Sequence, residues 1–526
     1  MAERRVRVLA QNGVDFAGTS GQLLIQMHIP RGAGFIDFQR SYFEAEVTIN
    51  QFTADSLVEN LGNFGLHSCI RRIRVSSGGV TLQELDDADR LMDVVELSLK
   101  PDESDSLRAC AGDPSSFISS TGGSSASTNA GTNGLMESQS ICCPPSGFVS
   151  RNQTGGALSV RRTPRLQAML RVYGGIFDVA QWPALAAPLD VEIELQRKMN
   201  QSLVKPIVVC ANIGGAPSNI VVSSKSYRVG GAGEPGEFPF YVGEMVILAR
   251  SDAAGPPPNF TYTRRKITNI ALTGAEPSTL SITLDGAAIA ADSENVSIRP
   301  ALDNIASVSI KNPALNLLQV PGDPEKLMKA VRQGLTYELK AFRSYRRVMI
   351  GNEGGESISY ELAERDVKAL FGVLFQEIYI GNQLTQPGPA SGEHITGYAW
   401  NIDGRSYPDQ FVVTENPTCA VHHLVSSRGF AAAEMEQNQF PARKISSACT
   451  THSDGVNQTK LVMAAPIYFE LPGVEKTSET GDMRGKNVRL DIQRSNAIDE
   501  GVLEANLFVV HNRVCTIRSD RVEVQS

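Results

Sequence analysis

Few side chains in this sequence are spaced in a way that could support catalysis or hold a ligand. The candidates are two adjacent histidines, His422 and His423, and the run His452-Ser453-Asp454. Adjacent histidines point to different sides of a helix or strand, and no third ligand follows at metal spacing, so the pair predicts a surface or structural role. The His-Ser-Asp run has the residue types of a hydrolytic triad. Sequence neighbours rarely form a triad, however, and no nucleophile elbow is present.

Two further patterns have simple structural explanations. The string at 231–236, GAGEPG, matches a dinucleotide-binding fingerprint. It lacks the flanking strand and helix, and Pro235 lies inside it, so it predicts a turn-rich loop. Asp86 and Asp87 fall in the first turns of a helix expected over 82–97, where the helix dipole favours acidic residues.

The aromatic residues do not indicate a sugar-binding platform. Such a platform needs several exposed aromatic side chains, and aromatic residues make up only 6% of the chain. Trp182 and Trp400 are therefore expected to anchor the core. The sequence predicts no catalytic, cofactor-binding or metal-binding residue, no cofactor, and a protein that is not an enzyme.

Composition describes a folded protein of several domains. The chain has 526 residues, 41% of them hydrophobic and 20% charged, which predicts two to four domains. Its 49 basic and 57 acidic residues give a net charge of −8. This balance argues against wholesale coating of nucleic acid but leaves room for a local basic face.

Cysteines and the N-terminal segment indicate a reducing compartment. The 8 cysteines are scattered apart from Cys142 and Cys143, and none has CxxC spacing. Buried free thiols are therefore favoured over structural disulfides. The first residues contain arginines without a following apolar segment, so no signal peptide is expected, and no apolar run is long enough for a membrane span.

The stretch at 305–350 organises the rest of the chain. It predicts a strand, a short helix and a second strand. Asp323 suits the N-cap of the helix, Pro324 suits its first position, and Gly334 suits its end. Leu327, Met328 and Val331 give one apolar stripe, enough to lie against a sheet. We expect one β-domain to end here and another to begin, with the helix as a rigid spacer.

Short strands dominate both halves. Alternation predicts strands at 6–10, 22–29, 35–50, 66–80 and 190–198 in the first half, and at 467–471 among others in the second. Residues 112–158 are rich in Ser and Gly and predict an exposed functional loop or a partly disordered one. Residues 199–304 contain many short β-like pieces and predict a small β-unit.

An internal repeat suggests how these pieces are connected. DVEIELQR at 190–197 matches NVRLDIQR at 487–494, and in the second copy a final strand, 503–511, follows almost at once. In the first copy the corresponding strand, 307–318, comes more than a hundred residues later. We therefore expect two similar β-domains, the first carrying an insertion before its last strand. The expected division is 1–198 and 305–334 for the first domain and linker helix, 199–304 for the insertion, and 335–526 for the second domain.

Two arginine clusters allow alternative interpretations. Arg4, Arg5 and Arg7 could form an arm that reaches a neighbour or the interior, or a solvated terminus. The cluster Arg71, Arg72 and Arg74 could pair with an adjacent subunit. It could equally protect an exposed sheet edge against misassociation.

Several motifs resemble one protein family. They are SYFEAEVTIN at 41–50, HSCIRRIRVSSGGVTLQELDDADRLMDVV at 67–95, AERDVKALF at 363–371 and NIDGRSYP at 401–408. In this order they resemble double jelly-roll major capsid proteins, nearest those of polinton-like viruses and virophages. The large insertion and the Ser/Gly-rich loop depart from that pattern and leave the exact lineage open.

The resemblance implies an all-β fold of two tandem eight-stranded jelly rolls, with short helices and a small β insertion in the first. It also implies a homotrimer of pseudo-hexagonal outline that tiles an icosahedral shell around double-stranded DNA, without sequence-specific DNA recognition. Its partners would be neighbouring trimers, penton and minor capsid proteins, and a host receptor through the outer loops. The alternative function is that of a β-sandwich glycan-binding or carbohydrate-active protein, since jelly rolls host both.

Overall fold

The computed structural model is almost entirely antiparallel β-structure. It describes residues 3–17, 23–49, 60–61, 65–98, 149–154, 157–162, 165–172, 174–196, 199, 203–204, 208–209, 218–222, 242–243, 245–252, 259–273, 279–287, 296–300, 308–350, 354–376, 395–413, 462–467, 482–494, 502–518 and 521–525. Among these residues, no helix is long and apolar enough to cross a membrane. Cys69 and Cys515 are buried free thiols.

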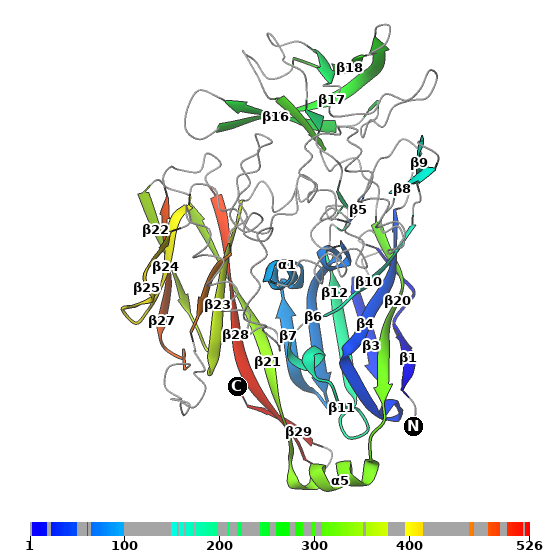
Figure 1. The fold of residues 1–526 in the computed structure, drawn as a ribbon, viewed down its shortest axis with the longest axis vertical. Helices are drawn as coiled ribbons and strands as arrows, with labels where there is room; N and C mark the ends of the chain where they lie inside the picture. Colours follow the sequence, from blue (N-terminus) through cyan, green and yellow to red (C-terminus); the bar gives the residue numbers. More distant parts are fainter. Residues whose placement is uncertain are drawn as a thin grey trace.

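The first half forms a sandwich of two sheets (Figure 1). One sheet has the strand order β1 (Arg4–Leu9), β20 (Val308–Val320), β4 (Phe35–Ile49), β10 (Arg165–Leu170), with β2 (Asp15–Ala17) and β11 (Trp182–Pro183) paired at its margins. The other has the order β3 (Leu24–Ile29), β12 (Leu189–Leu195), β6 (Ile70–Ser77), β7 (Val80–Asp86). We call these strands the first sandwich.

The second half repeats this arrangement strand for strand. Its first sheet has the order β21 (Leu335–Ile350), β28 (Val502–Arg518), β23 (Val367–Gln376), β26 (Met463–Pro466), with β29 (Arg521–Gln525) paired to β28. The other sheet has the order β22 (Gly354–Glu361), β27 (Asn487–Arg494), β24 (Ile395–Ile402), β25 (Arg405–Val413). In both halves the chain visits the two sheets in the same sequence, which gives two tandem jelly rolls.

The repeated octapeptide occupies equivalent places in the two jelly rolls. β12 and β27 each lie second in their sheet, and β20 and β28 each return to the centre of the other sheet as the last strand of the roll. Burial alternates along β12, with Val191 and Ile193 inside. The same alternation places Val488 and Leu490 of β27 in the core of the second roll.

The segment between β12 and β20 builds a sheet of its own. Its order is β14 (Val208–Val209), β19 (Val296–Pro300), β16 (Met245–Asp252), β17 (Asn259–Thr273), β18 (Thr279–Leu284), β15 (Asn219–Val222). Figure 1 shows β16, β17 and β18 beyond the end of the sandwiches that is opposite helix α5 (Pro324–Gln333). Nearby are two small pairs, β5 (Asn60–Leu61) with β13 (Leu203–Val204), and β8 (Val149–Thr154) with β9 (Ala157–Arg162).

The linker helix has the ends that its sequence predicts. The Asp323 carboxylate accepts hydrogen bonds from the backbone N–H groups of Glu325 and Lys326, Pro324 begins the helix, and Gly334 follows it at a φ of 93°. Leu327 and Val331 are buried, whereas Met328 is 44% exposed. The apolar stripe is thus narrower than expected, and the outer face of α5 is mostly charged.

The helix expected over 82–97 is wrong in its first third. Residues up to Asp86 belong to β7, which pairs with β6 through a turn at Gly78 and Gly79, both at positive φ. Asp87 has a φ of 54°, a left-handed conformation that ends the strand, and α1 (Ala88–Ser98) follows. Cross-strand pairing with β6 overrides the local helical pattern here.

Two other expected segments differ in part from the structure. β8 and β9 occupy the end of the predicted 112–158 loop, because Val149 to Arg162 can pair as a hairpin; residues 112–148 lie outside the described part of the chain. Most of the strand expected at 467–471 also lies outside the described residues, and β26 ends just before it.

Candidate functional site between the two sandwiches

The two sandwiches meet along a sheet that is buried on both faces. In β28, Leu507 and Val509 belong to the core inside the second sandwich, while Phe508 and Val510 belong to the core of the first. Phe371 in β23 also joins the first core. A strand that buries both faces gives a continuous apolar run instead of alternation. The outer face of β21-β28-β23-β26 is therefore an internal surface of the chain.

On the first sandwich, a short 3-10 helix, η4 (Gly175–Asp178), approaches this face beside β7. Gly174 has a φ of 85°, and a Cβ there would lie 2.5 Å from the Phe342 ring. Gln83 is fully buried, and its side-chain oxygen accepts a hydrogen bond of 2.9 Å from the Ile176 N–H. Glycine at 174 thus permits a backbone-to-ring contact that any other residue would block.

Trp182 reaches across the same junction. Its ring centroid lies 5.3 Å from that of Tyr337 in β21, and the Tyr337 hydroxyl donates a hydrogen bond of 2.9 Å to the Gln181 carbonyl. The indole N–H of Trp182 donates to the Ala187 carbonyl at 2.8 Å, so its polar group is satisfied while the ring is fully buried. Burial raises the pKa of Tyr337 to about 12.

A network of charged groups closes the rim of the junction. Asp87, only 3% exposed, accepts hydrogen bonds of 2.8 Å from the Ser344 hydroxyl and from Nε of Arg346, and it pairs with Nη2 of Arg346. Arg90 in α1 donates to Glu504 Oε1 in β28 at 2.5 Å. These contacts join residues more than 250 positions apart in the sequence.

The neighbouring Asp89 is buried inside this network. Its pKa is raised to about 6, first by burial and in small part by the charge of Glu504, while Arg90 and backbone N–H groups act in the opposite direction. A carboxyl group with a raised pKa is held in a site that favours its neutral form. The junction therefore contains one acid that resists ionisation beside one, Asp87, that is paired with a cation.

The equivalent face of the first sandwich carries charged side chains and is exposed along β1 and β10, while Ala314, Asn316 and Leu318 in its central strand β20 are buried. On the outer side of β1-β20-β4-β10, Arg7 pairs with Glu44 at 2.7 Å and Arg165 with Glu46 at 3.7 Å. The large apolar side chains Leu9 and Met169 are 56% and 39% exposed there. Within the described part of this chain, no other segment covers the face as the first sandwich covers that of the second.

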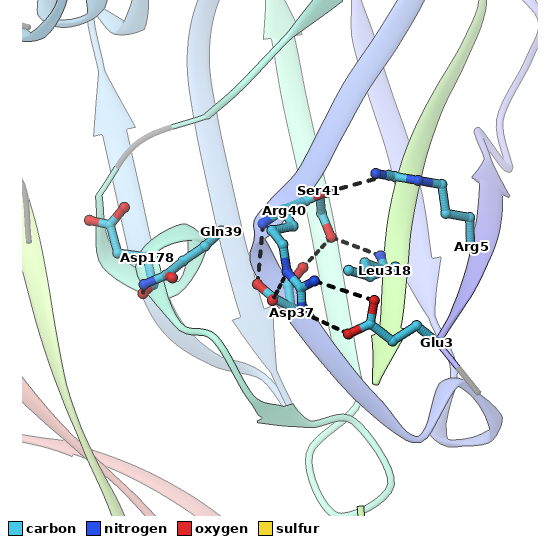
Figure 2. Close-up of polar contacts among 8 residues, drawn as sticks. All are labelled: Glu3, Arg5, Asp37, Gln39, Arg40, Ser41, Asp178 and Leu318. Atoms are coloured by element: carbon cyan, nitrogen blue, oxygen red, sulfur yellow. Dashed lines mark hydrogen bonds and ion pairs between the residues drawn. The ribbon is translucent and has the colours of Figure 1, made fainter. Parts of the chain in front are cut away.

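A bulge in β4 shapes one end of this face (Figure 2). Between Asp37 and Tyr42, β4 has extra residues relative to β20. The Ser41 hydroxyl bridges the interruption, because it accepts from the Leu318 N–H at 3.0 Å and donates to the Asp37 carbonyl at 2.5 Å. The bulge is also tied to η4, since the Gln39 side chain donates to the Asp178 carbonyl at 2.6 Å.

The arginines of the N-terminal strand do not form an arm. Residues 4–9 are β1, paired along its length with β20, so this backbone is an ordered strand and not a free arm. The side chains of Arg4, Arg5 and Arg7 are exposed to solvent, and their contact with a neighbouring subunit stays a prediction. Arg5 lies over the Tyr42 ring at 5.2 Å, and Figure 2 shows its guanidinium reaching the Arg40 carbonyl. The backbone hydrogen bonds to β20 hold residues 4–9 in an extended strand.

The second arginine cluster also has partners within the chain. Arg71 pairs with Glu194 at 2.8 Å, Arg72 with Glu194 at 3.0 Å and Arg74 with Glu192 at 3.8 Å. β6 lies between β12 and β7, so the interpretation as a sheet edge is wrong. These residues form cross-strand ion pairs on a sheet face. Pairing with an adjacent subunit stays a prediction.

The remaining candidate residues separate into two groups. Trp182 and Trp400 are both fully buried, which confirms them as core anchors. Asp87 lies directly before α1, at the N-terminal end of that helix, and its carboxylate also pairs with Arg346 across the junction; Asp86 is the last residue of β7. The histidine pair, the His-Ser-Asp run and the string at 231–236 lie outside the described residues. Among the described side chains, no group of three or more His, Cys, Asp or Glu is placed to hold a metal ion.

Comparison with known proteins gives matches at the level of structure only. No protein-family model and no curated protein sequence matches the chain. Among solved structures, PBCV-1 VP54 fitted into a reconstruction of the virophage Sputnik matches with 8% identity and a TM-score of 0.49, over 100% of this chain and 96% of that one. The Faustovirus major capsid protein matches with 9% identity and a TM-score of 0.46, over 98% and 90%. The mavirus major capsid protein matches with 10% identity and a TM-score of 0.40, over 99% and 90%.

Proposed function

We propose that this chain is the major capsid protein of an icosahedral double-stranded DNA virus of the polinton-like or virophage type. It acts as a structural tile, not as an enzyme, and its place is the capsid shell of the virion. Three copies form a ring with a pseudo-hexagonal outline. Neighbouring trimers, penton proteins and minor capsid proteins would contact this ring, and a host receptor would contact its outer loops.

One observation supports this proposal above all others. The two sandwiches have the same strand order, yet the outer face of β21-β28-β23-β26 is covered by the first sandwich, whereas the equivalent face of β1-β20-β4-β10 is exposed along β1 and β10 and no described segment packs on it. If the contact between sandwiches is repeated between chains, the second sandwich of one copy covers the exposed face of the next. Three chains then close a ring of six similar units.

The two similar sandwiches also suggest where the domains of the chain begin and end. We propose that residues 1–198 and the strand before α5 form the first roll, 199–304 its insertion, 305–334 its last strand with the linker helix, and 335–526 the second roll. The junction and α5 would keep the two rolls at a fixed angle, as a repeating wall requires. The insertion would crown the trimer on the outer surface, at the end opposite α5.

Oligomeric state is the direct test. Size-exclusion chromatography with light scattering should give three times the 56.7 kDa of one chain. Negative-stain images should show a hexagonal outline. A stable monomer with an intact fold would contradict the proposal.

A substitution on the exposed face sharpens this test. Met169→Asp places a charge where the neighbouring copy would pack, so we expect trimers to dissociate while circular dichroism is unchanged. Val221→Asp is the matched control, since Val221 is 40% exposed in the insertion sheet and Met169 is 39% exposed. Trimers that survive Met169→Asp, or that are lost equally in the control, would place the interface elsewhere.

A further inference from the structure

The chain is acidic overall, yet one end of it is basic. Helix α5 runs beneath both sandwiches at the end opposite the insertion sheet (Figure 1). The exposed basic residues at this end are Lys326, Lys329 and Arg332 on α5, Arg518 at the end of β28 and Arg521 at the start of β29. We call these five residues the α5 basic end. The net charge of the whole chain is −8, so this grouping is against the overall balance.

The fold itself brings these residues together. α5 packs against β21 and β28, and it buries Leu327 and Val331 there, which turns Lys326, Lys329 and Arg332 outward. Arg518 joins them because its Nε lies 3.1 Å from where a Cβ on Gly334 would be, directly after the helix. Residues from two distant parts of the sequence thus form one basic surface.

Carboxylates at this end only partly offset the positive charge. Asp323 accepts hydrogen bonds from the first backbone N–H groups of α5 and lies 3.7 Å from Lys326. Arg521 is 3.4 Å from Glu523, and the Arg521 side chain is 81% exposed. The third acidic residue, Glu325, is exposed in the first turn of α5. Exposed pairs of this kind are weak, so a stronger anion can displace them.

The surface chemistry distinguishes between possible polyanions. A helix that inserts into a lipid surface needs a free apolar face, and α5 uses its apolar face for packing, with Met328 as the one large apolar side chain that it exposes. Binding of single strands depends on aromatic side chains that stack on bases, and α5 has none. A row of exposed lysine and arginine side chains suits the regular phosphates of a duplex, which need no base contact.

We propose that the α5 basic end binds the phosphate backbone of double-stranded DNA without sequence preference. This inference rests on the proposed function, in which one end of each tile faces the packaged genome. Binding by one chain is weak, and three α5 basic ends on one trimer strengthen it through multivalency.

The test is fluorescence anisotropy of the purified protein with a labelled random-sequence DNA duplex. Affinity should fall steeply between about 50 and about 200 mM salt, with a slope of roughly 0.9 for each phosphate neutralised. In the triple variant Lys329→Glu, Arg332→Glu and Arg518→Glu, we expect at least a tenfold loss of affinity and a flatter salt slope. The variant with glutamine at all three positions should give an intermediate loss of affinity. It also keeps the test decisive if the triple glutamate variant does not fold.

The matched control is Arg264→Glu with Lys266→Glu, a pair of exposed basic residues in the insertion sheet. Its affinity for DNA should equal that of the wild type. Equal loss in the control, unchanged binding in both triple variants, or binding to phosphatidylserine vesicles in place of duplex DNA would overturn the inference. Chromatography of the same samples separates the two proposals. Trimers that do not bind DNA contradict this inference alone, while monomers that bind through α5 contradict the trimer.

Discussion

The outer faces of the two equivalent sheets have opposite chemistry. In the second sandwich the face presents Phe508, Val510 and Phe371 and is covered by the first sandwich. In the first sandwich it presents ion pairs such as Arg7 with Glu44, and no described segment packs on it. The same topology thus supports a permanent contact in one place and a solvent-compatible surface in the other. A face with charged and polar groups of this kind is compatible with solvent and also with contact to another protein surface.

The largest effect is expected from Phe508→Ala. Phe508 is fully buried at the junction, so its truncation should lower the free energy of unfolding by about 3–5 kcal/mol. Met169→Ala on the equivalent open face should change it by less than about 0.5 kcal/mol in the monomer. Urea denaturation of both variants measures the difference. Similar losses at the two positions would remove the contrast between the faces.

Gly174→Ala tests how closely the sandwiches approach. Alanine there meets the buried Phe342 ring and also requires a left-handed backbone, which together should cost about 2–4 kcal/mol. Gly78→Ala is the control, because Gly78 also has a positive φ but nothing within 4 Å of its Cβ position. It should cost only about 1 kcal/mol. Equal losses in thermal denaturation would show that backbone strain, not the junction, decides the result.

Asp89→Asn tests the electrostatics of the junction. The pKa of Asp89 rises from 3.8 in the unfolded chain to about 6 in the folded one, so between these values the folded state holds more protons. Stability from this group therefore falls as pH rises through that window. Asparagine carries no charge and so removes the cost of burying an ionised carboxylate. The free energy of unfolding of the variant should therefore rise by at most about 3 kcal/mol at pH 8.

The gain should shrink towards zero near pH 4, where Asp89 is protonated in the folded wild type. Buried His511, with a pKa lowered to about 4 chiefly by burial, has the opposite effect, since its contribution is lost as pH falls from 6.5. His511 is present in both proteins, so its effect cancels in the difference. Denaturation curves across pH that keep a constant offset would exclude this account of Asp89.

Arg346→Ala should have the smallest effect. It leaves Asp87 buried without its cation, but the Arg346 side chain is 48% exposed, so we expect a loss of about 1–2 kcal/mol. Arg484→Ala, the control, removes an exposed pair with Asp482 and should have a smaller effect, because solvent screens this pair. A double-mutant cycle of Arg346 with Asp87 measures the coupling, and a coupling near zero would remove these residues from the junction.

Much of the fold can be predicted from local sequence. The alternation of Phe43, Ala45 and Val47 specifies β4, and the capping residues around 323–334 specify α5. The octapeptide repeat identifies equivalent strands because each copy needs the same alternation of buried and exposed positions. Alternation along a strand and capping of a helix both depend on residues that are close together in the sequence, so local sequence is enough to predict them.

The junction could not be predicted in the same way. Asp87, Arg346 and Glu504 are far apart in the sequence, and charged residues of this kind are usually solvated. One signal was present in LFVV at 507–510, a continuous apolar run where an exposed sheet would alternate. The helix expected from 82 failed for a related reason, since β6 supplies the pairing that local propensity cannot show.

The long strand β28 has a consequence for synthesis. It lies between β21 and β23 and contributes alternate side chains to both cores, although it comes near the end of the chain. A ribosome that has not yet released residues 502–518 holds a nascent polypeptide whose second roll has no centre. We therefore expect a chain truncated before residue 502 to lack the central strand of the second roll and not to complete that roll.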